Sequence, residues 1–257
     1  MPSLENAAVL PLLLVPVIVG FVTTSIKSYI DRIFLVLLAL FFLKFGAAQA
    51  ILVNLVVMFL ASLFFYARNE SALRKLPRQA AWWVIAAALL GAALGRWIAL
   101  QLPVRVFLIV LGLYAILVGL RLGLVKIKPP ARPAEAKPSV AWLSGIFAVL
   151  TGLISAGGKP FQVPLLVMGV KLAPPPAYLL ASLGTFMASL GALGAQLLLA
   201  PGALNGSIFL WAVYFYVAIT AVALIVERFW TPKLQQVVTY LIAPLLVLAG
   251  IRLLMMR

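Results

Sequence analysis

Two lysines interrupt apolar sequence at matching places in the two halves of this chain. Lys27 stands seven residues after Gly20, and Lys159 stands seven residues after Gly152. A short apolar segment follows each lysine, so we expect each one close to the start of a helix. Two ammonium groups favour an anion, and the N–H groups and positive dipole end of a helix N-terminus add to that preference. The spacing therefore predicts one anion-binding site that contains Lys27 and Lys159.

Small and polar residues at the same two breaks are candidates to complete this site. Gly157 and Gly158 would let the backbone approach a ligand closely. Side chains that can donate hydrogen bonds to anion oxygens are present at the first break (Thr24, Ser25) and at the second (Ser155, Gln162). Two other interpretations stay open at this point. The polar residues could cap helices or stabilise turns, and both lysines could extend to the lipid headgroups.

Asp31 is the one carboxylate near a break, and it follows Lys27 by four residues. At that spacing two side chains share a helix face and can pair. Asp31 is therefore a candidate for coupling to protons, and a local salt bridge with Lys27 or Arg32 is the alternative.

Residue types that carry out catalysis are scarce in this chain. It contains no Cys and no His, which excludes disulfides, thiol chemistry and Ser–His nucleophiles. A membrane enzyme needs a nucleophile with a base, or a metal site. No phosphate-binding Gly-x-x-x-x-Gly-Lys-Ser/Thr motif is present either. We therefore expect no catalytic residues, no metal and no cofactor, and a protein that is not an enzyme.

The composition places the elements that must position the lysines in a lipid bilayer. About 65% of the 257 residues are hydrophobic and 10% are charged, whereas soluble domains are about half apolar and a quarter charged. Ten apolar segments are predicted: Ala8–Thr24, Ile33–Leu43, Ala47–Tyr66, Ala80–Leu100, Val104–Leu120, Val140–Ser155, Gln162–Val170, Ala177–Ala200, Ser207–Val226 and Leu234–Met255. A spanning helix needs ~20 apolar residues. The second and seventh segments are therefore expected to be short or re-entrant, and their breaks to line a cavity.

The ten segments form two similar halves, predicted as five-segment repeats at residues 1–122 and 139–257 with a basic linker at 123–138. Similar residues recur at a nearly constant offset of 127 to 132 positions. Besides the lysine pair, the matches join Lys44 and Ala50 to Lys171 and Ala177, Phe59–Ser62 to Phe186–Ser189, and Gly119–Leu122 to Gly250–Leu253. Four matches in the same order indicate a duplicated unit.

Loop charges orient the two repeats. The loop at 201–206, which is the counterpart of the loop at 67–79, has no charge. Lys and Arg are instead concentrated in the 67–79 loop (Arg68, Arg74, Lys75, Arg78) and in the linker (Lys126, Lys128, Arg132, Lys137). Because basic loops stay on the cytoplasmic side, the two counterpart loops are predicted on opposite sides, which means inverted repeats. Both chain termini are then expected outside. The net charge of +15 is accounted for by topology, and no nucleic-acid partner is expected.

One stretch resembles a known family. Gly152–Leu166, which reads GLISAGGKPFQVPLL, is similar to the signature of the sulfite exporter TauE/SafE family, with a glycine-rich run before a Val-Pro-Leu-Leu tract. Ala177, Ser182 and the small-residue helix that follows also fit it. The resemblance implies a bacterial inner-membrane protein that transports sulfur-containing anions such as sulfite, sulfonates such as sulfoacetate, and related organic acids. Lys27 and Lys159 stand where the family often has glycine, which adds positive charge at the expected site.

These observations predict an all-α, polytopic secondary transporter of a small, sulfur-containing anion, working by alternating access around a central lysine site. Its expected partners are that anion and the bilayer, and a homodimer is compatible with the sequence. An anion channel, a carrier of a non-sulfur organic acid and a structural or assembly factor are the alternatives.

Overall fold

The structure is a computed structural model that describes residues 9–25, 33–125, 128, 130 and 138–256. All regular secondary structure in these ranges is helical, as the sequence predicts. The elements are α1 (Val9–Ser25), α2 (Ile33–Phe41), α3 (Ala47–Arg68), α4 (Glu70–Leu73), α5 (Arg78–Gln101), α6 (Val104–Leu124), α7 (Ser139–Ile154), α8 (Lys159–Pro164), η2 (Leu165–Gly169), α9 (Pro174–Leu199), η3 (Pro201–Ala203), α10 (Gly206–Glu227) and α11 (Pro232–Met255).

Six helices of the described ranges, α3, α5, α6, α9, α10 and α11, are long and apolar enough to cross a bilayer. The apolar helices α1 and α7 are shorter. The outward faces of the bundle carry large apolar side chains such as Leu90, Trp142 and Leu210, which a soluble surface would not expose in such number. The protein is therefore a multi-pass membrane protein.

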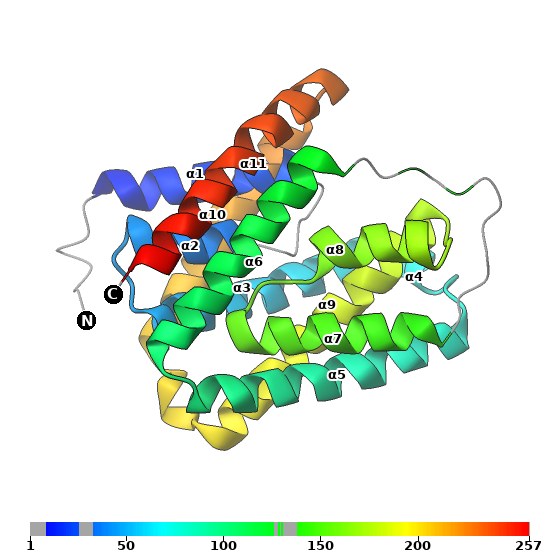
Figure 1. The fold of residues 1–257 in the computed structure, drawn as a ribbon, viewed down its shortest axis with the longest axis horizontal. Coiled ribbons are helices and arrows are strands. Elements are labelled where there is room, and N and C mark those ends of the chain that lie inside the picture. Colours follow the sequence, from blue (N-terminus) through cyan, green and yellow to red (C-terminus); the bar gives the residue numbers. More distant parts are fainter. Residues whose placement is uncertain (1–8, 26–32, 126–127, 129, 131–137, 257) are drawn as a thin grey trace.

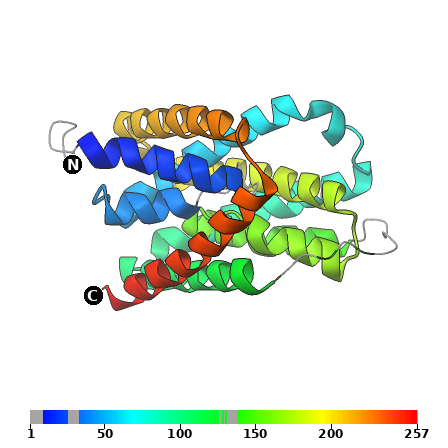
Figure 2. The ribbon, with the colours of Figure 1, turned by 90° about the horizontal axis from the view of Figure 1, so that it is seen from above.

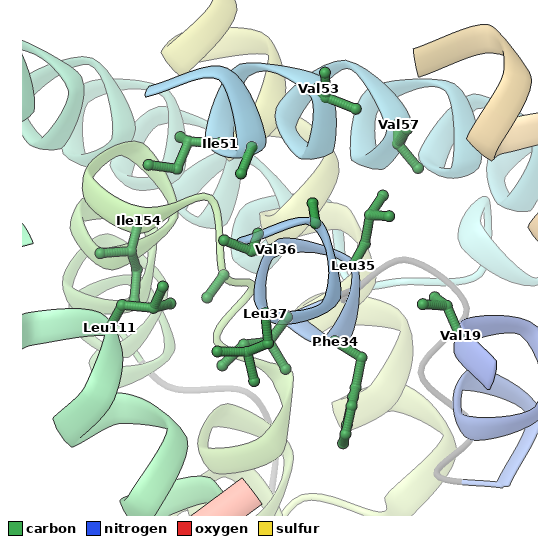
Figure 3. Packing of buried hydrophobic residues seen from close by; sticks show 14 of the residues in the cluster. Val19, Phe34, Leu35, Val36, Leu37, Ile51, Val53, Val57, Leu111 and Ile154 are labelled. Carbon is green, nitrogen blue, oxygen red and sulfur yellow. The ribbon is translucent and has the colours of Figure 1, made fainter. Parts of the chain in front are cut away.

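The short helix α2 lies inside the bundle, where protein surrounds it on several sides. Figure 3 shows Phe34, Leu35, Val36 and Leu37 pointing outward from α2 in different directions, toward side chains of neighbouring helices such as Leu111 of α6. All four α2 residues are buried. A helix that is apolar all round is a buried helix, which explains how nine residues too few to span a bilayer can still be stable at membrane depth.

Glycines bring α5 into close contact with α7 and α9. A Cβ atom placed on Gly91 would lie 2.5 Å from the carbonyl oxygen of Gly145, and one on Gly191 would lie 2.5 Å from that of Leu89. Gly152 is packed even more closely against the carbonyl oxygen of Ala92. Small residues let helix backbones approach in this way inside membranes. The three helices run side by side (Figures 1 and 2) and form one tightly packed layer.

A second close pair is formed by α6 and α11, which cross the molecule together (Figure 1). On the other side of the bundle α1 runs beside α10 (Figure 2). The long helix α3 contacts both α10 and α9. It thereby connects the α1–α10 pair to the layer of α5, α7 and α9.

The structure refines several predicted segment ends. The predicted loop at 67–79 contains the short helix α4, and α6 continues four residues beyond the predicted end at Leu120. The seventh segment begins at Lys159 instead of Gln162 and changes into the π-helical turn η2 after Pro164. Pro160 fits the first turn of a helix, where a missing N–H has no cost. Lys159 therefore belongs to the helix itself.

Candidate functional site

The break between α7 and α8 is held in place by side chains from two other helices. Ser155, which ends α7, has a left-handed backbone with φ of 47°. Asn54 of α3 donates hydrogen bonds to the Ser155 carbonyl oxygen at 2.7 Å and to its hydroxyl at 3.2 Å. The Tyr114 hydroxyl of α6 donates to the carbonyl oxygen of Gly157. These bonds satisfy backbone groups that no water can reach in a bilayer, so the break is a defined structure.

Lys159 follows this break and its side chain is buried, with 4% of the residue exposed. Its Nζ atom lies 4.7 Å from the ring centre of Tyr178 on α9 and 5.2 Å from that of Phe65 on α3. Both distances are within the range of cation–π attraction, which stabilises a desolvated ammonium by up to ~2 kcal/mol. The structure thus holds the Lys159 side chain in the protein interior, beside two aromatic rings that also contact each other edge to face.

Two other predicted site residues near Lys159 contact protein groups. The Gln162 side chain is buried and donates to the Ser144 hydroxyl at 2.8 Å. A Cβ atom on Gly158 would overlap the side chain of Phe147. The absence of a side chain at Gly158 therefore allows α8 to pack against α7, and a close approach of this glycine to a ligand stays a prediction.

A cavity of about 500 Å³ lies beside the aromatic pair, between α1, α3, α9 and α10. Phe65 and Tyr178, whose rings contact the Lys159 ammonium, both line it. The other lining residues are Thr24, Ala61, Phe64, Arg68, Asn69, Thr220, Ala223, Leu224, Glu227 and Trp230. The cavity is thus mostly apolar and aromatic, with a few hydroxyl and charged groups.

Thr24 is a predicted site residue that the structure places in this cavity wall. Its hydroxyl donates to the Gly20 carbonyl oxygen of its own helix at 2.9 Å and approaches that of Ala223 on α10 at 3.4 Å. Lys27 and Asp31 lie outside the described residues, and so does the side chain of Ser25. Their roles stay predictions.

The charged residues that line the cavity are Arg68 and Glu227, at the C-terminal ends of α3 and α10. The Arg68 Nη1 atom lies 3.4 Å from Glu227 Oε2, and the side chains are 54% and 40% exposed. The cavity therefore extends from the buried Lys159 region to a solvated ion pair on the side of the 67–79 loop.

Sequence reasoning missed the aromatic pair and the ion pair. Phe65 and Tyr178 are 113 positions apart, and nothing in an apolar segment separates a ligand-facing aromatic from an ordinary one. In the sequence, Arg68 belongs to the basic 67–79 loop that indicates topology, and Glu227 directly follows the predicted segment Ser207–Val226. One signal was available in the sequence: Phe65 precedes Arg68 by three residues, which places the two side chains on the same face of a helix.

The comparison with protein families gave one finding that covers most of the molecule. The profile of the family described as Sulfite exporter TauE/SafE matches residues 12–253. The chain belongs to this family. The resemblance found around Gly152–Leu166 thus extends over nearly the whole chain, and the TauE/SafE family to which the chain belongs is one of membrane transporters. The comparisons with curated proteins and with solved structures gave no match.

Proposed function

We propose that this TauE/SafE protein is a secondary transporter of a small sulfur-containing anion and that Lys159 is the cation that binds it. The observation that carries the proposal is the buried ammonium beside a cavity whose wall includes both of its aromatic neighbours. An ionisable side chain within a membrane bundle is costly and is a functional candidate for that reason. Lys27 is the proposed partner of Lys159 from the first half of the chain.

The two rings around Lys159 suit a site that is alternately empty and loaded. Without an anion, Phe65 and Tyr178 offer their π faces to the ammonium. With an anion present, charge-assisted hydrogen bonds from the ammonium to the anion oxygens are stronger than a ring contact. Rotation of a ring toward the cavity would bring the ammonium and the anion together. The rings would then separate Lys159 from the cavity only while no substrate is bound.

The lining of the cavity favours an organosulfonate within the proposed substrate class. Phe64, Leu224 and Trp230 present apolar surface, and Thr24 and Thr220 add hydroxyl groups to the same space. A sulfonate such as sulfoacetate carries an anionic head on an organic part, which matches polar donors in an apolar pocket. Sulfite would use the same charged groups but gain less from the apolar wall.

Two pairs of equivalent residues support the inverted-repeat architecture of the proposal. Lys44 and Lys171, related by the offset of 127, both adopt the left-handed backbone, with φ of 57° and 64°. Phe59 and Phe186, related by the same offset, stack on each other with ring centres 5.9 Å apart. Equivalent residues from two repeats meet each other at a two-fold axis, so this stack is expected where such an axis passes between α3 and α9.

The α6–α11 interface offers the same kind of support. Gly112 faces the carbonyl oxygen of Gly250, and Gly119 faces that of Ala243. An offset of 131 relates Gly112 to Ala243 and Gly119 to Gly250, so each contact is the counterpart of the other. Two-fold symmetry between the units 1–122 and 139–257 would produce this reciprocity.

The two halves differ in how closely the equivalent helices pack, which supports alternating access. On one side of the proposed two-fold axis, the cavity lies among α1, α3 and α10. On the other side, the equivalent helices are α7, α9 and α5, and glycine contacts close the space among them. At the offset of 127, the cavity residues Asn69 and Ala223 correspond to Gln196 and Arg96, where Arg96 Nε donates to Gln196 Oε1 at 2.6 Å. Exchange of the two packings would open the opposite side.

Reconstituted transport tests the function. Purified protein in liposomes is given labelled sulfite, labelled sulfoacetate or labelled acetate, and initial rates are measured against concentration. Saturable uptake of a sulfur anion supports the carrier, and an ohmic current supports a channel instead. Lys159→Met keeps an unbranched side chain but removes the ammonium, and it should reduce uptake to background. A matched control is Lys171→Met, because Lys171 is exposed and lies on the same chain segment. Normal transport by Lys159→Met would refute the proposed site.

Cysteine accessibility tests alternating access, and the absence of Cys in the natural chain means that no background must be removed. Thr220→Cys places a thiol in the cavity wall. A membrane-impermeant maleimide added on the side of the 67–79 loop should label it, and substrate should change the labelling rate. Equal labelling from both sides, unchanged by substrate, would contradict a carrier that exposes its cavity to one side at a time.

A further inference from the structure

The ion pair at the mouth of the cavity stands in line with Lys159. Arg68 follows Phe65 by three residues on α3, a rise of about 4.5 Å along one helix face. Phe65 contacts the Lys159 ammonium. Glu227 follows Thr220 and Leu224 on one face of α10, and all three line the cavity. An anion that enters from this side would meet the charges of Arg68 and Glu227 before it reaches Lys159.

The geometry of this pair is that of a contact that is easily exchanged. The distance between Arg68 Nη1 and Glu227 Oε2 is long, at 3.4 Å, and both side chains are about half exposed. The ion pair between Arg74 and Glu70 on the neighbouring helix α4 is shorter, at 2.6 Å. Exposed ion pairs contribute little net stability. An anion can therefore replace Glu227 on Arg68 without a large loss in stability.

We propose that Arg68 is the entry-site residue that captures the anion at the cavity mouth, and that Glu227 is the counter-ion which the anion displaces. This inference rests on the proposed function. A guanidinium presents two parallel N–H groups that match the oxygens of a sulfite or sulfonate group. Glu227 neutralises Arg68 when no anion is bound. It also opposes anion entry, because a carboxylate in the mouth repels like charge.

The competing explanation is that the pair simply fastens α3 to α10. A fastening pair loses the same bond whichever partner is neutralised, so Arg68→Gln and Glu227→Gln should then have the same effect. An entry site predicts opposite effects. Arg68→Gln removes the capturing charge and leaves a bare carboxylate, whereas Glu227→Gln removes the competitor and leaves Arg68 available.

The experiment measures the half-saturating concentration for labelled sulfoacetate on the side of the 67–79 loop, in liposomes of known orientation. Arg68→Gln should raise it about 2- to 5-fold, and Glu227→Gln should lower it by a similar factor, as expected for one partly exposed charge. The half-saturating concentration of the double variant should lie between those of the two single variants. High salt should shrink both shifts, because the charges are screened. Arg74→Gln and Glu70→Gln are the matched controls and should leave the value unchanged.

Shifts in the same direction for Arg68→Gln and Glu227→Gln, or no shift in either, would overturn the entry site. If Arg68→Gln fails to fold, Arg68→Lys replaces it. Arg68→Lys should then raise the half-saturating concentration, and Glu227→Gln should lower it. If Lys159→Met abolishes transport while Arg68→Gln and Glu227→Gln shift the half-saturating concentration in the same direction, only the entry site is refuted. If Lys159→Met transports normally while the Arg68 and Glu227 variants shift the half-saturating concentration in opposite directions, only the Lys159 site is refuted. No wild-type uptake of any tested anion overturns both.

Discussion

The ammonium of Lys159 lies 4.7 Å from the ring centre of Tyr178, although the two residues belong to different helices on opposite sides of the η2 turn. Tyr178 also lines the cavity. The ring of Tyr178 thus contacts both the cation and the cavity, as the ring of Phe65 also does, and a substitution can measure its role.

Two substitutions of Tyr178 should distinguish the role of its ring from the role of its hydroxyl. Tyr178→Phe keeps the π face and should change sulfoacetate affinity less than about 2-fold. Tyr178→Leu removes the π face, which holds the ammonium only while no anion is bound. The loss of ~1–2 kcal/mol of cation–π energy therefore destabilises the empty site, and the substrate should bind roughly 5- to 30-fold more tightly. Titration calorimetry in detergent measures both. Tyr240→Leu, on an exposed part of α11, is the control, and equal affinities of the Leu and Phe variants would exclude this role.

A methyl group at Gly158 should disturb the α7–α8 turn, because its Cβ would overlap the side chain of Phe147. Gly158→Ala is expected to destabilise the protein by ~1–3 kcal/mol through overpacking, visible as a lower melting temperature in detergent. Gly169→Ala is the matched control, since nothing lies within 4 Å of a Cβ there. A melting temperature equal to the wild type would mean that the turn is not closely packed.

The buried bond between Arg96 and Gln196 should respond unequally to loss of either partner. Arg96 is 4% exposed and Gln196 is fully buried. Gln196→Leu leaves a guanidinium without this acceptor and should cost ~3–5 kcal/mol, whereas Arg96→Leu leaves a neutral amide and should cost ~1–3 kcal/mol. The double variant should be more stable than Gln196→Leu alone. Denaturation in detergent measures all three, and additive losses would show that the two side chains do not depend on each other.

Topology reporters should place the 67–79 loop and the 201–206 loop on opposite sides of the membrane. The reason is the unequal charge of the two counterpart loops. A fusion after Arg74 is expected in the cytoplasm and a fusion at Asn205 outside, read by enzyme reporters active on one side only. A fusion within the 126–137 linker should match Arg74. Reporters at Arg74 and Asn205 on the same side would contradict the inverted repeats.

Hydropathy alone identified the helices, because a chain with this composition can satisfy its backbone in a bilayer only by intrahelical hydrogen bonds. Segment ends such as Ala47 and Val104 were placed correctly from the sequence. The start of α8 was misplaced by three residues because a Gly-Gly-Lys-Pro run is typical of a loop. The short helix α4 was missed because four residues carry too little periodicity to detect.

The sequence by itself determined that the chain is an all-α membrane protein and that Lys159 follows a break in an apolar segment. The family signature in Gly152–Leu166 was also readable without a structure. Only the tertiary structure decided what surrounds Lys159 and where Arg68 meets Glu227. The physical reason is that apolar helices offer many equivalent faces to one another. Close approaches at glycines such as Gly152 select which faces meet, and this selection brings Phe65, Tyr178 and the cavity together.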